Sequence, residues 1–233
     1  MVKTAAGIKN IIENPKSIFS LLKQDEKEEL LRNTSIAKYR RNEFIFKERD
    51  KPNGLIILVE GKVKIYMEGV GGREQIIRMA KPFGLIGYRA LLCNEDHIAS
   101  ALTIEESVVC TIKTDFIMNR ALKNSDFSFE IIQNLAHELA FSNGRIINLT
   151  QKHIRGRLAE SLLILKEKYG VENDGITLKA YLSRDDIANL SNMTTSNAIR
   201  TLSHFANERV IAIDGRNIKI LDADRLERVS KLG

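Results

Sequence analysis

The residues from Leu182 to Ile211 constrain the fold of this chain more than any other segment. Ser183 is a favourable N-cap residue, and Asp186 stands three positions later, as in a capping box. Asn192 suits the left-handed backbone of a tight turn, because asparagine tolerates that conformation best after glycine. Thr194 then predicts the start of a second helix. The segment is therefore predicted to form two short helices around a tight turn.

The predicted second helix has two different faces. Residues at i, i+3, i+4 and i+7 are expected to face the core: Ala198, Thr201, Leu202 and Phe205. The opposite face is polar and carries Ser196, Arg200, Ser203 and Asn207. In a DNA-binding helix-turn-helix, the N-terminal residues of the second helix contact base edges in the major groove. Arg200 has the donor geometry that contacts guanine O6 and N7 together.

A β-hairpin is predicted directly after these helices. Val210–Ile213 and Ile218–Leu221 are apolar runs that flank Asp214-Gly215, a strong signal for a tight turn. A helix-turn-helix followed by a hairpin is a winged helix. The residues expected to contact double-stranded DNA are Arg184, Thr194, Thr195, Ser196, Asn197, Arg200, Ser203 and Arg216. The alternative is a generic helical hairpin with a solvated polar face.

Residues 35–112 have a different character. Short β-rich runs (EFIF, GLIILVE, KVKIYM, QIIRMA and VVCTI) alternate with turns that contain glycine or charged residues. Evenly spaced short strands with such turns predict an all-β sandwich or barrel. In front of this region, Ile18–Leu31 has the pattern of an amphipathic helix. Ile154–Tyr169 has the same pattern behind it, with Gly170 as its stop signal.

A long helix is predicted between the β-rich region and Ile154. Six positions spaced 3, 4, 3, 4 and 3 form a narrow seam: Ile132, Leu135, Leu139, Ser142, Ile146 and Leu149. A core helix of a single chain has a broader apolar stripe, so the seam favours pairing of two copies of the chain. A helix packed on the β-rich domain remains the alternative, since Ser142 and Gly144 interrupt the seam.

Composition excludes several classes of protein. No apolar run approaches the roughly 18 residues of a membrane span, and the first residues lack the apolar stretch of a signal peptide, so we expect a cytoplasmic protein without membrane contact. Cys93 and Cys110 are too few for an iron–sulfur cluster, and no role can be assigned to Cys93. No pattern of catalytic or metal-binding residues is found, so neither an enzyme nor a metal site is expected. The net charge of +6 permits a polyanionic partner.

Taken in order, these features resemble the CRP/FNR family of bacterial transcription regulators. The resemblance is carried by YRRNEFIFKERDKPNGLIILVEGKVKIY, KPFGLIGYRALL, the seam helix, RGRLAESLLIL and the helix-turn-helix. It implies a cyclic-nucleotide-binding-like β-roll, a dimerisation helix and a winged helix. It also implies a homodimer that binds a pseudo-palindromic operator and recruits or blocks RNA polymerase.

The sequence departs from the family pattern at the start of the recognition helix. Many relatives carry an Arg-Glu pair there and an arginine four residues after the glutamate. Thr195 and Ser196 stand in place of the pair, while Arg200 keeps the later position. The DNA sequence recognised is therefore expected to differ from that of the best-known relatives.

The second departure concerns the effector. Family members that bind cyclic nucleotides use a Gly-Glu step for the ribose and an Arg-Ser-Ala for the phosphate. This chain has GLIGY at 84–88 and Ala-Ser-Ala at 99–101. A phosphodiester buried without its cation is poorly compensated, so conventional binding of cAMP is not expected. The residues assigned to an effector pocket by the resemblance are Gly84, Gly87, Tyr88, Arg89, Ser100 and Ala101, and the effector itself stays unknown.

The expected fold is α+β with three parts. Residues 1–125 are expected to form the effector-sensing β-roll, 126–151 the dimerisation helix, and 152–233 the winged-helix DNA-binding domain. The predicted function is a homodimeric, sequence-specific DNA-binding transcription regulator. The alternative function is a small-molecule-binding β-roll module whose helical C-terminus contacts other proteins.

Overall fold

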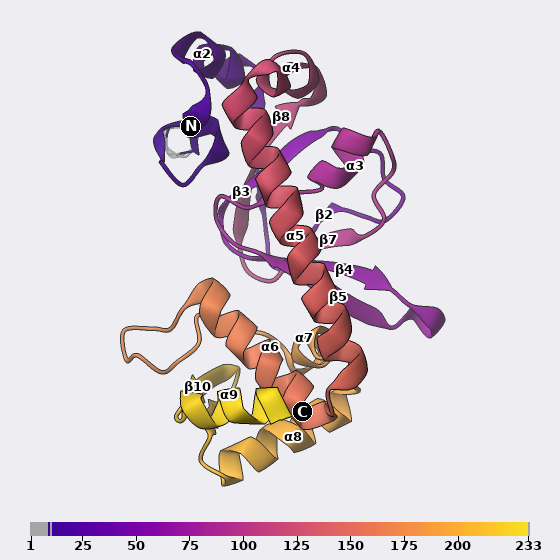
Figure 1. Ribbon diagram of the computed structural model, residues 1–233, viewed down its shortest axis with the longest axis vertical. Coiled ribbons are helices and arrows are strands. Elements are labelled where there is room, and N and C mark those ends of the chain that lie inside the picture. Colours follow the sequence, from indigo (N-terminus) through magenta and orange to yellow (C-terminus); the bar gives the residue numbers. More distant parts are fainter. Residues whose placement is uncertain (1–8, 10, 233) are drawn as a thin grey trace. The chain divides into compact units, whose positions relative to one another are not determined.

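The computed structural model describes residues 9 and 11–232, and the chain forms two compact units (Figure 1). The first unit comprises residues up to 67 together with 77–139, and the second comprises 68–76 together with 140–233. The fold is α+β, as predicted. None of the helices within the described residues is long and apolar enough to cross a membrane.

Two four-stranded sheets form the β-rich part of the chain. The first has the order β1 (Thr34–Tyr39), β8 (Ser107–Lys113), β3 (Gly54–Glu60) and β6 (Leu85–Ile86). The second has the order β2 (Phe44–Phe46), β7 (Ser100–Thr103), β4 (Val63–Glu68) and β5 (Glu74–Ala80). The paired strands β1–β8, β3–β8, β3–β6, β2–β7 and β4–β7 are all antiparallel. These pairings agree with the predicted sandwich or barrel.

Strand β3 is buried on both of its faces, which explains why GLIILVE is a continuous apolar run. Ile56 and Leu58 belong to a core shared by strands of both sheets. Leu55 and Ile57 belong to a second core, which is completed by helices. Successive side chains of a strand point to opposite faces, so a central strand covered on both sides needs apolar residues at every position.

The helices of the first unit complete the second core. They are η1 (Ile18–Leu21), α2 (Gln24–Arg32), α3 (Tyr88–Cys93), α4 (Thr114–Asn119) and η3 (Ala121–Lys123). The single helix predicted over Ile18–Leu31 was wrong, because Lys23 has an extended backbone and separates η1 from α2. The Lys23 N–H donates to Glu26 Oε2 at 2.8 Å, so the carboxylate satisfies a free amide at the new helix start.

Helix α5 spans Ser125–Gln151 and is continuous over its 27 residues (Figure 1). Asn124 Oδ1 accepts the N–H groups of Asp126 and Phe127 and thereby caps the first turn. Phe127 and Ile131 are buried in the core of the first unit. Beyond Ile131 most of the apolar side chains of α5 are exposed.

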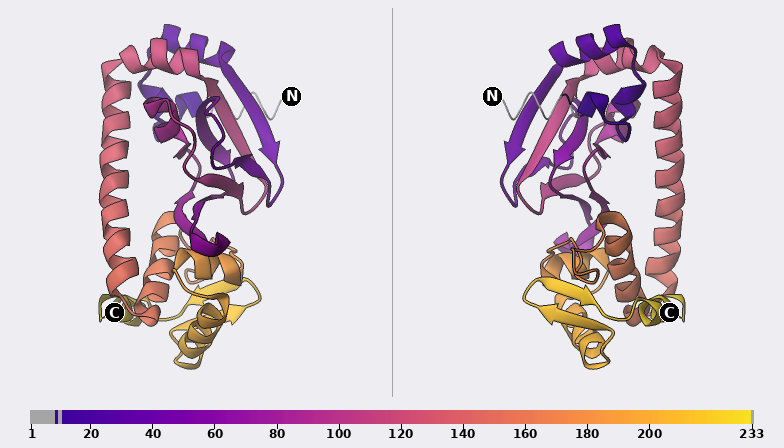
Figure 2. Two further views of the ribbon diagram at one scale, coloured as in Figure 1. Left: turned by 90° about the vertical axis from the view of Figure 1, so that its right-hand side faces the viewer. Right: turned by 90° about the vertical axis from the view of Figure 1, so that its left-hand side faces the viewer.

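The second unit contains a winged helix (Figure 2). The elements that lie wholly within the second unit are η2 (Val70–Gly72), α6 (Ile154–Tyr169), α7 (Arg184–Leu190), α8 (Thr195–Asn207), β9 (Ile211–Asp214), β10 (Asn217–Ile220) and α9 (Ala223–Leu232). The predicted hairpin is present but shifted by one residue, so that Gly215 and Arg216 form its turn. Gly215 has a φ of 57°, which glycine adopts at little cost, and this conformation sets the position of the turn.

Candidate nucleic-acid interface

The two helices of the helix-turn-helix begin at the predicted caps. Ser183 Oγ accepts the N–H of Asp186 at 3.0 Å, and Asp186 Oδ2 accepts the N–H of Ser183 at 3.3 Å. Thr194 Oγ1 accepts the N–H of Asn197 at 3.3 Å. Asn192 has a φ of 50°, the left-handed conformation expected of it at the turn. These local interactions fix the helix starts and the turn between them.

Helix α8 has the two faces that its sequence predicts. Ala198, Leu202 and Phe205 are each at most 1% exposed and anchor it in the second unit. The opposite face exposes Thr194, Ser196, Arg200 and Ser203, with Thr195 and Asn197 half-buried at its edge. Six of the eight predicted DNA-contacting residues therefore lie together in this short stretch.

The polar groups of α8 are held by bonds within the protein. The Thr195 hydroxyl donates to Asp185 Oδ1 at 2.6 Å, and Ser203 Oγ donates to the carbonyl of Ile199 at 3.0 Å. Arg200 Nη2 donates to Asn197 Oδ1 at 2.7 Å, so the guanidinium extends toward the N-terminus of the helix. That end is the part of a recognition helix that enters the major groove.

The two remaining DNA-contact candidates are connected with the wing. Arg184 Nη2 donates to the carbonyl of Gly215 at 2.7 Å, so this side chain joins α7 to the wing turn. Arg216 is exposed in that turn. Arg184 therefore supports the wing, and Arg216 extends the exposed surface beyond α8.

Three side chains converge on the carbonyl groups at the C-terminus of α7, and we name them the turn clamp: Gln75, Arg145 and Arg157. Gln75 Nε2 donates to the carbonyl of Asn189 at 2.7 Å, and Arg145 Nη2 to that of Leu190 at 2.5 Å.

Arg157 Nε donates to Ser191 and its Nη2 to Asn192, both at 3.1 Å. The last carbonyls of a helix lack partners inside the helix, and the turn clamp supplies them.

Arg145 is the buried member of the turn clamp, with 7% of its surface exposed. Burial lowers the pKa of its guanidinium, and the charge of Glu160 opposes that effect. The Glu160 carboxylate in turn accepts hydrogen bonds from Lys152 Nζ and Ser230 Oγ. The charge of the Arg145 guanidinium is therefore compensated by a carboxylate that other side chains hold in place. Sequence reasoning missed the whole clamp, because its bonds join residues far apart in the chain.

The structure places the predicted effector residues in tightly packed surroundings. Gly87 and Tyr88 stand at the start of α3, and a Cβ atom on Gly87 would lie 2.7 Å from His97 Cε1. Ser100 and Ala101 are buried in β7, where Ser100 Oγ accepts the N–H of Glu48 at 3.0 Å. Ala101 is 0% exposed, which leaves little room beside it.

The two other effector candidates also have partners within the protein. Arg89 Nη1 forms an ion pair with Glu95 Oε2 at 2.7 Å. Gly84 donates its N–H to the carbonyl of Lys81 at 2.9 Å. Gly84, Gly87, Tyr88 and Arg89 thus lie around β6 and the start of α3, whereas Ser100 and Ala101 lie in β7.

An arginine that the sequence analysis overlooked lies beside Tyr88. Arg78 Nε is 3.2 Å from Glu138 Oε1, and the guanidinium lies 5.9 Å from the centre of the Tyr88 ring. Arg78 also donates to the carbonyl of Leu85. Burial raises the pKa of the Tyr88 phenol, so this group stays neutral. The signal for Arg78 was a lone charge within the apolar run QIIRMA.

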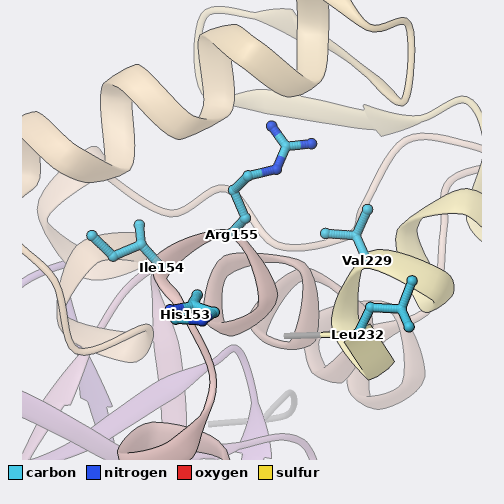
Figure 3. Close-up of a pocket in the computed structure, with 5 residues that line it drawn as sticks. All are labelled: His153, Ile154, Arg155, Val229 and Leu232. Carbon is cyan, nitrogen blue, oxygen red and sulfur yellow. The ribbon is translucent and has the colours of Figure 1, made fainter.

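A shallow pocket of about 510 Å³ lies between the start of α6 and the end of α9. Figure 3 shows its lining residues, which are His153, Ile154, Arg155, Val229 and Leu232. The Arg155 guanidinium is paired with Glu208 at 2.8 Å and covers the Phe205 ring, so it is engaged elsewhere. The pocket therefore offers an apolar surface without a converging set of reactive groups.

Comparison with known proteins identifies both parts of the chain. The model of the cyclic nucleotide-binding domain matches residues 36–124, and that of the Crp-like helix-turn-helix domain matches residues 156–229. The chain belongs to the CRP/FNR family of transcription regulators. It is thus a DNA-binding regulator of the CRP/FNR type, and its relatives are regulators and not enzymes.

Relatives of this CRP/FNR regulator support the assignment over most of its length. The CRP-like cAMP-activated global transcriptional regulator of Mycobacterium tuberculosis is 26% identical over 189 residues, which are 81% of this chain and 84% of that protein. The structure of FixK2 from Bradyrhizobium japonicum has a TM-score of 0.76 at 22% identity and covers 84% of this chain and 96% of that one. The structure of a putative CRP/FNR regulator of Eubacterium rectale has a TM-score of 0.74 at 16% identity. That match covers 92% of this chain and 97% of the other one.

Replacing Arg145 is expected to destabilise the second unit. Arg145→Met keeps much of the side-chain volume but leaves the Leu190 carbonyl without its donor, which costs about 1–3 kcal/mol. Urea unfolding followed by circular dichroism should show a lower midpoint for this variant. Gln151→Ala, an exposed change six residues later on the same helix and outside the seam, is the control and should unfold like the wild type. Equal midpoints for Arg145→Met and the wild type would contradict the importance of this bond.

Proposed function

We propose that the protein is a homodimeric, sequence-specific regulator that places one α8 in the major groove of each operator half-site. The observation that supports this most is the capped α8 with Ser196, Arg200 and Ser203 exposed on one face. Arg200 reads guanine, and Arg184 and Arg216 act at the wing, where the backbone phosphates lie. Phosphate contacts of this kind position a protein, whereas contacts to base edges give specificity.

The homodimer is supported by the exposed stripe of α5. Ile132, Leu139 and Ile146 are each 60–63% exposed, and Leu135 is 38% exposed. They occupy the seam positions that the sequence analysis assigns to pairing with a second chain. Two such helices in parallel bury these side chains against each other and place two α8 helices in symmetric positions.

A symmetric dimer accounts for the remaining parts of the proposal. Its two recognition helices match a pseudo-palindromic operator. Bound there, the protein acts on transcription in the cytoplasm by recruiting or blocking RNA polymerase. The sequence relationship to the CRP/FNR regulators supports this role.

The effector in this proposal is not a conventionally bound cyclic nucleotide. Ala99 stands where a cyclic-nucleotide site needs a cation, and it is 6% exposed. Tyr88 is 5% exposed, and the nearby Arg78 is already paired with Glu138. These residues do not fit a buried phosphodiester, because Ala99 carries no charge and the guanidinium of Arg78 is already paired.

DNA binding should be steeply dependent on salt, since each released counterion contributes to the slope of log affinity against log salt. Arg200→Ala should lose discrimination at one base pair of each half-site, by about 5–150-fold per half-site. Fluorescence anisotropy with a selected operator and a scrambled duplex measures both quantities.

Arg41→Ala, an exposed change in the first unit, should bind like the wild type. An unchanged ratio of operator to scrambled affinity in Arg200→Ala would refute the proposed readout. Failure of the intact dimer to bind any duplex at low salt would favour a module whose C-terminus contacts proteins.

The dimer is expected to dissociate when a charge enters the seam. Leu139→Glu places two carboxylates in the apolar interface, where their desolvation is not compensated. Light scattering coupled to size-exclusion chromatography should show a dimer for the wild type and a monomer for the variant. His137→Glu introduces the same charge on the other side of α5 and should remain dimeric. A dimeric Leu139→Glu protein would contradict the assignment of this interface.

Addition of cAMP is expected to leave the protein unchanged. A ligand that binds the folded state at 100 times its Kd stabilises that state by about 2.7 kcal/mol, which a thermal scan detects easily. We expect no shift of Tm in millimolar cAMP. A clear rise in Tm that disappears in Tyr88→Ala would show that the nucleotide binds in the β-roll after all.

A further inference from the structure

Ile199 is an exposed apolar side chain in the middle of the reading face of α8. It is 47% exposed, and it alone among the large hydrophobic residues described in α8 is left open to solvent. Ala198, Leu202 and Phe205 already fill the buried side of this helix. Isoleucine is also a weaker helix former than lysine, glutamate or arginine. Neither packing nor helix stability therefore accounts for an isoleucine at this position.

The neighbours of Ile199 leave its side chain uncovered. Ser196 and Ser203 lie about one turn away on either side, and both are short. Ser203 Oγ donates to the Ile199 carbonyl, so that hydroxyl is directed at the helix backbone. Helical side chains lean toward the helix N-terminus, so Ile199 covers the surface near Ser196. This is the end of the helix that enters the groove.

We propose that Ile199 is a specificity residue that contacts the C5-methyl group of a thymine in the operator. The proposal rests on the proposed function, because it requires α8 to lie in the major groove. The thymine methyl is the one apolar group that a base pair presents there, and proteins read it by apolar contact.

Ile199 and Arg200 are consecutive in α8, so their targets are close together on the DNA. The thymine contacted by Ile199 lies within about two base pairs of the guanine contacted by Arg200. We therefore expect this regulator to recognise half-sites that contain both bases.

The test removes the methyl group without changing any hydrogen bond. An operator is first selected from random duplexes with the full-length wild-type protein. Each thymine is then replaced by deoxyuridine, one symmetric pair at a time. At one thymine position the wild type should bind about 15-fold more weakly, because a buried methyl contributes about fourfold at each of two half-sites.

Ile199→Ser should bind the thymine and deoxyuridine operators equally well, at about the affinity of the wild type for the deoxyuridine duplex. Ile98→Ser is the matched control, since Ile98 is a 49% exposed isoleucine of the first unit, and it should keep the wild-type preference for thymine over deoxyuridine. Circular dichroism should show that both variants are folded, because each loses only an exposed side chain.

Two results would overturn the inference. One is wild-type binding that is insensitive to deoxyuridine at every thymine, and the other is an Ile199→Ser protein that keeps the full thymine preference. In both results the operator is still bound, so the proposed function survives. Failure of the wild type to enrich any duplex contradicts the proposed function and this inference with it.

Discussion

The structure of the second unit depends on donors for the carbonyl groups at the end of α7. Four consecutive carbonyls, from Asn189 to Asn192, accept bonds from Gln75, Arg145 and Arg157. A buried helix end without such partners is costly, so the turn that follows has one favoured geometry. Helix α8 begins three residues after Asn192, and the direction of its exposed face follows from that turn.

The turn clamp also connects the reading helix with elements that continue into the first unit. Gln75 stands on β5 and Arg145 on α5, and each of these elements extends beyond the second unit. Arg78 and Glu138, paired in the first unit, stand on the same two elements. Strand β5 and helix α5 thus each carry one residue of the turn clamp and one residue of the Arg78–Glu138 pair.

Much of the fold and the site could be predicted because the signals are local. The caps at Ser183 and Thr194, the left-handed Asn192 and the buried face of α8 depend on residues within a few positions of each other. Sequence reasoning failed where the deciding contact is distant. Gln75 meets Asn189 across more than a hundred residues, and the pairing of Arg78 with Glu138 needs the folded β-rich unit.

Two further errors have simple physical causes. The turn of the wing lies at Gly215 and Arg216, because the register of β9 and β10 decides between neighbouring turn positions. Strand β6, with only two residues, is too short to show an alternating pattern. The contact residues for DNA and effector remain predictions, since burial shows which groups are available but not what they bind.

The central claim is that two symmetric α8 helices read one operator, and a hydroxyl-radical footprint on a selected duplex tests it most directly. The account predicts two protected regions on the same face of the DNA, with centres about 10 base pairs apart and inverted-repeat sequences beneath them. A single protected region, or protection without an inverted repeat, would contradict it.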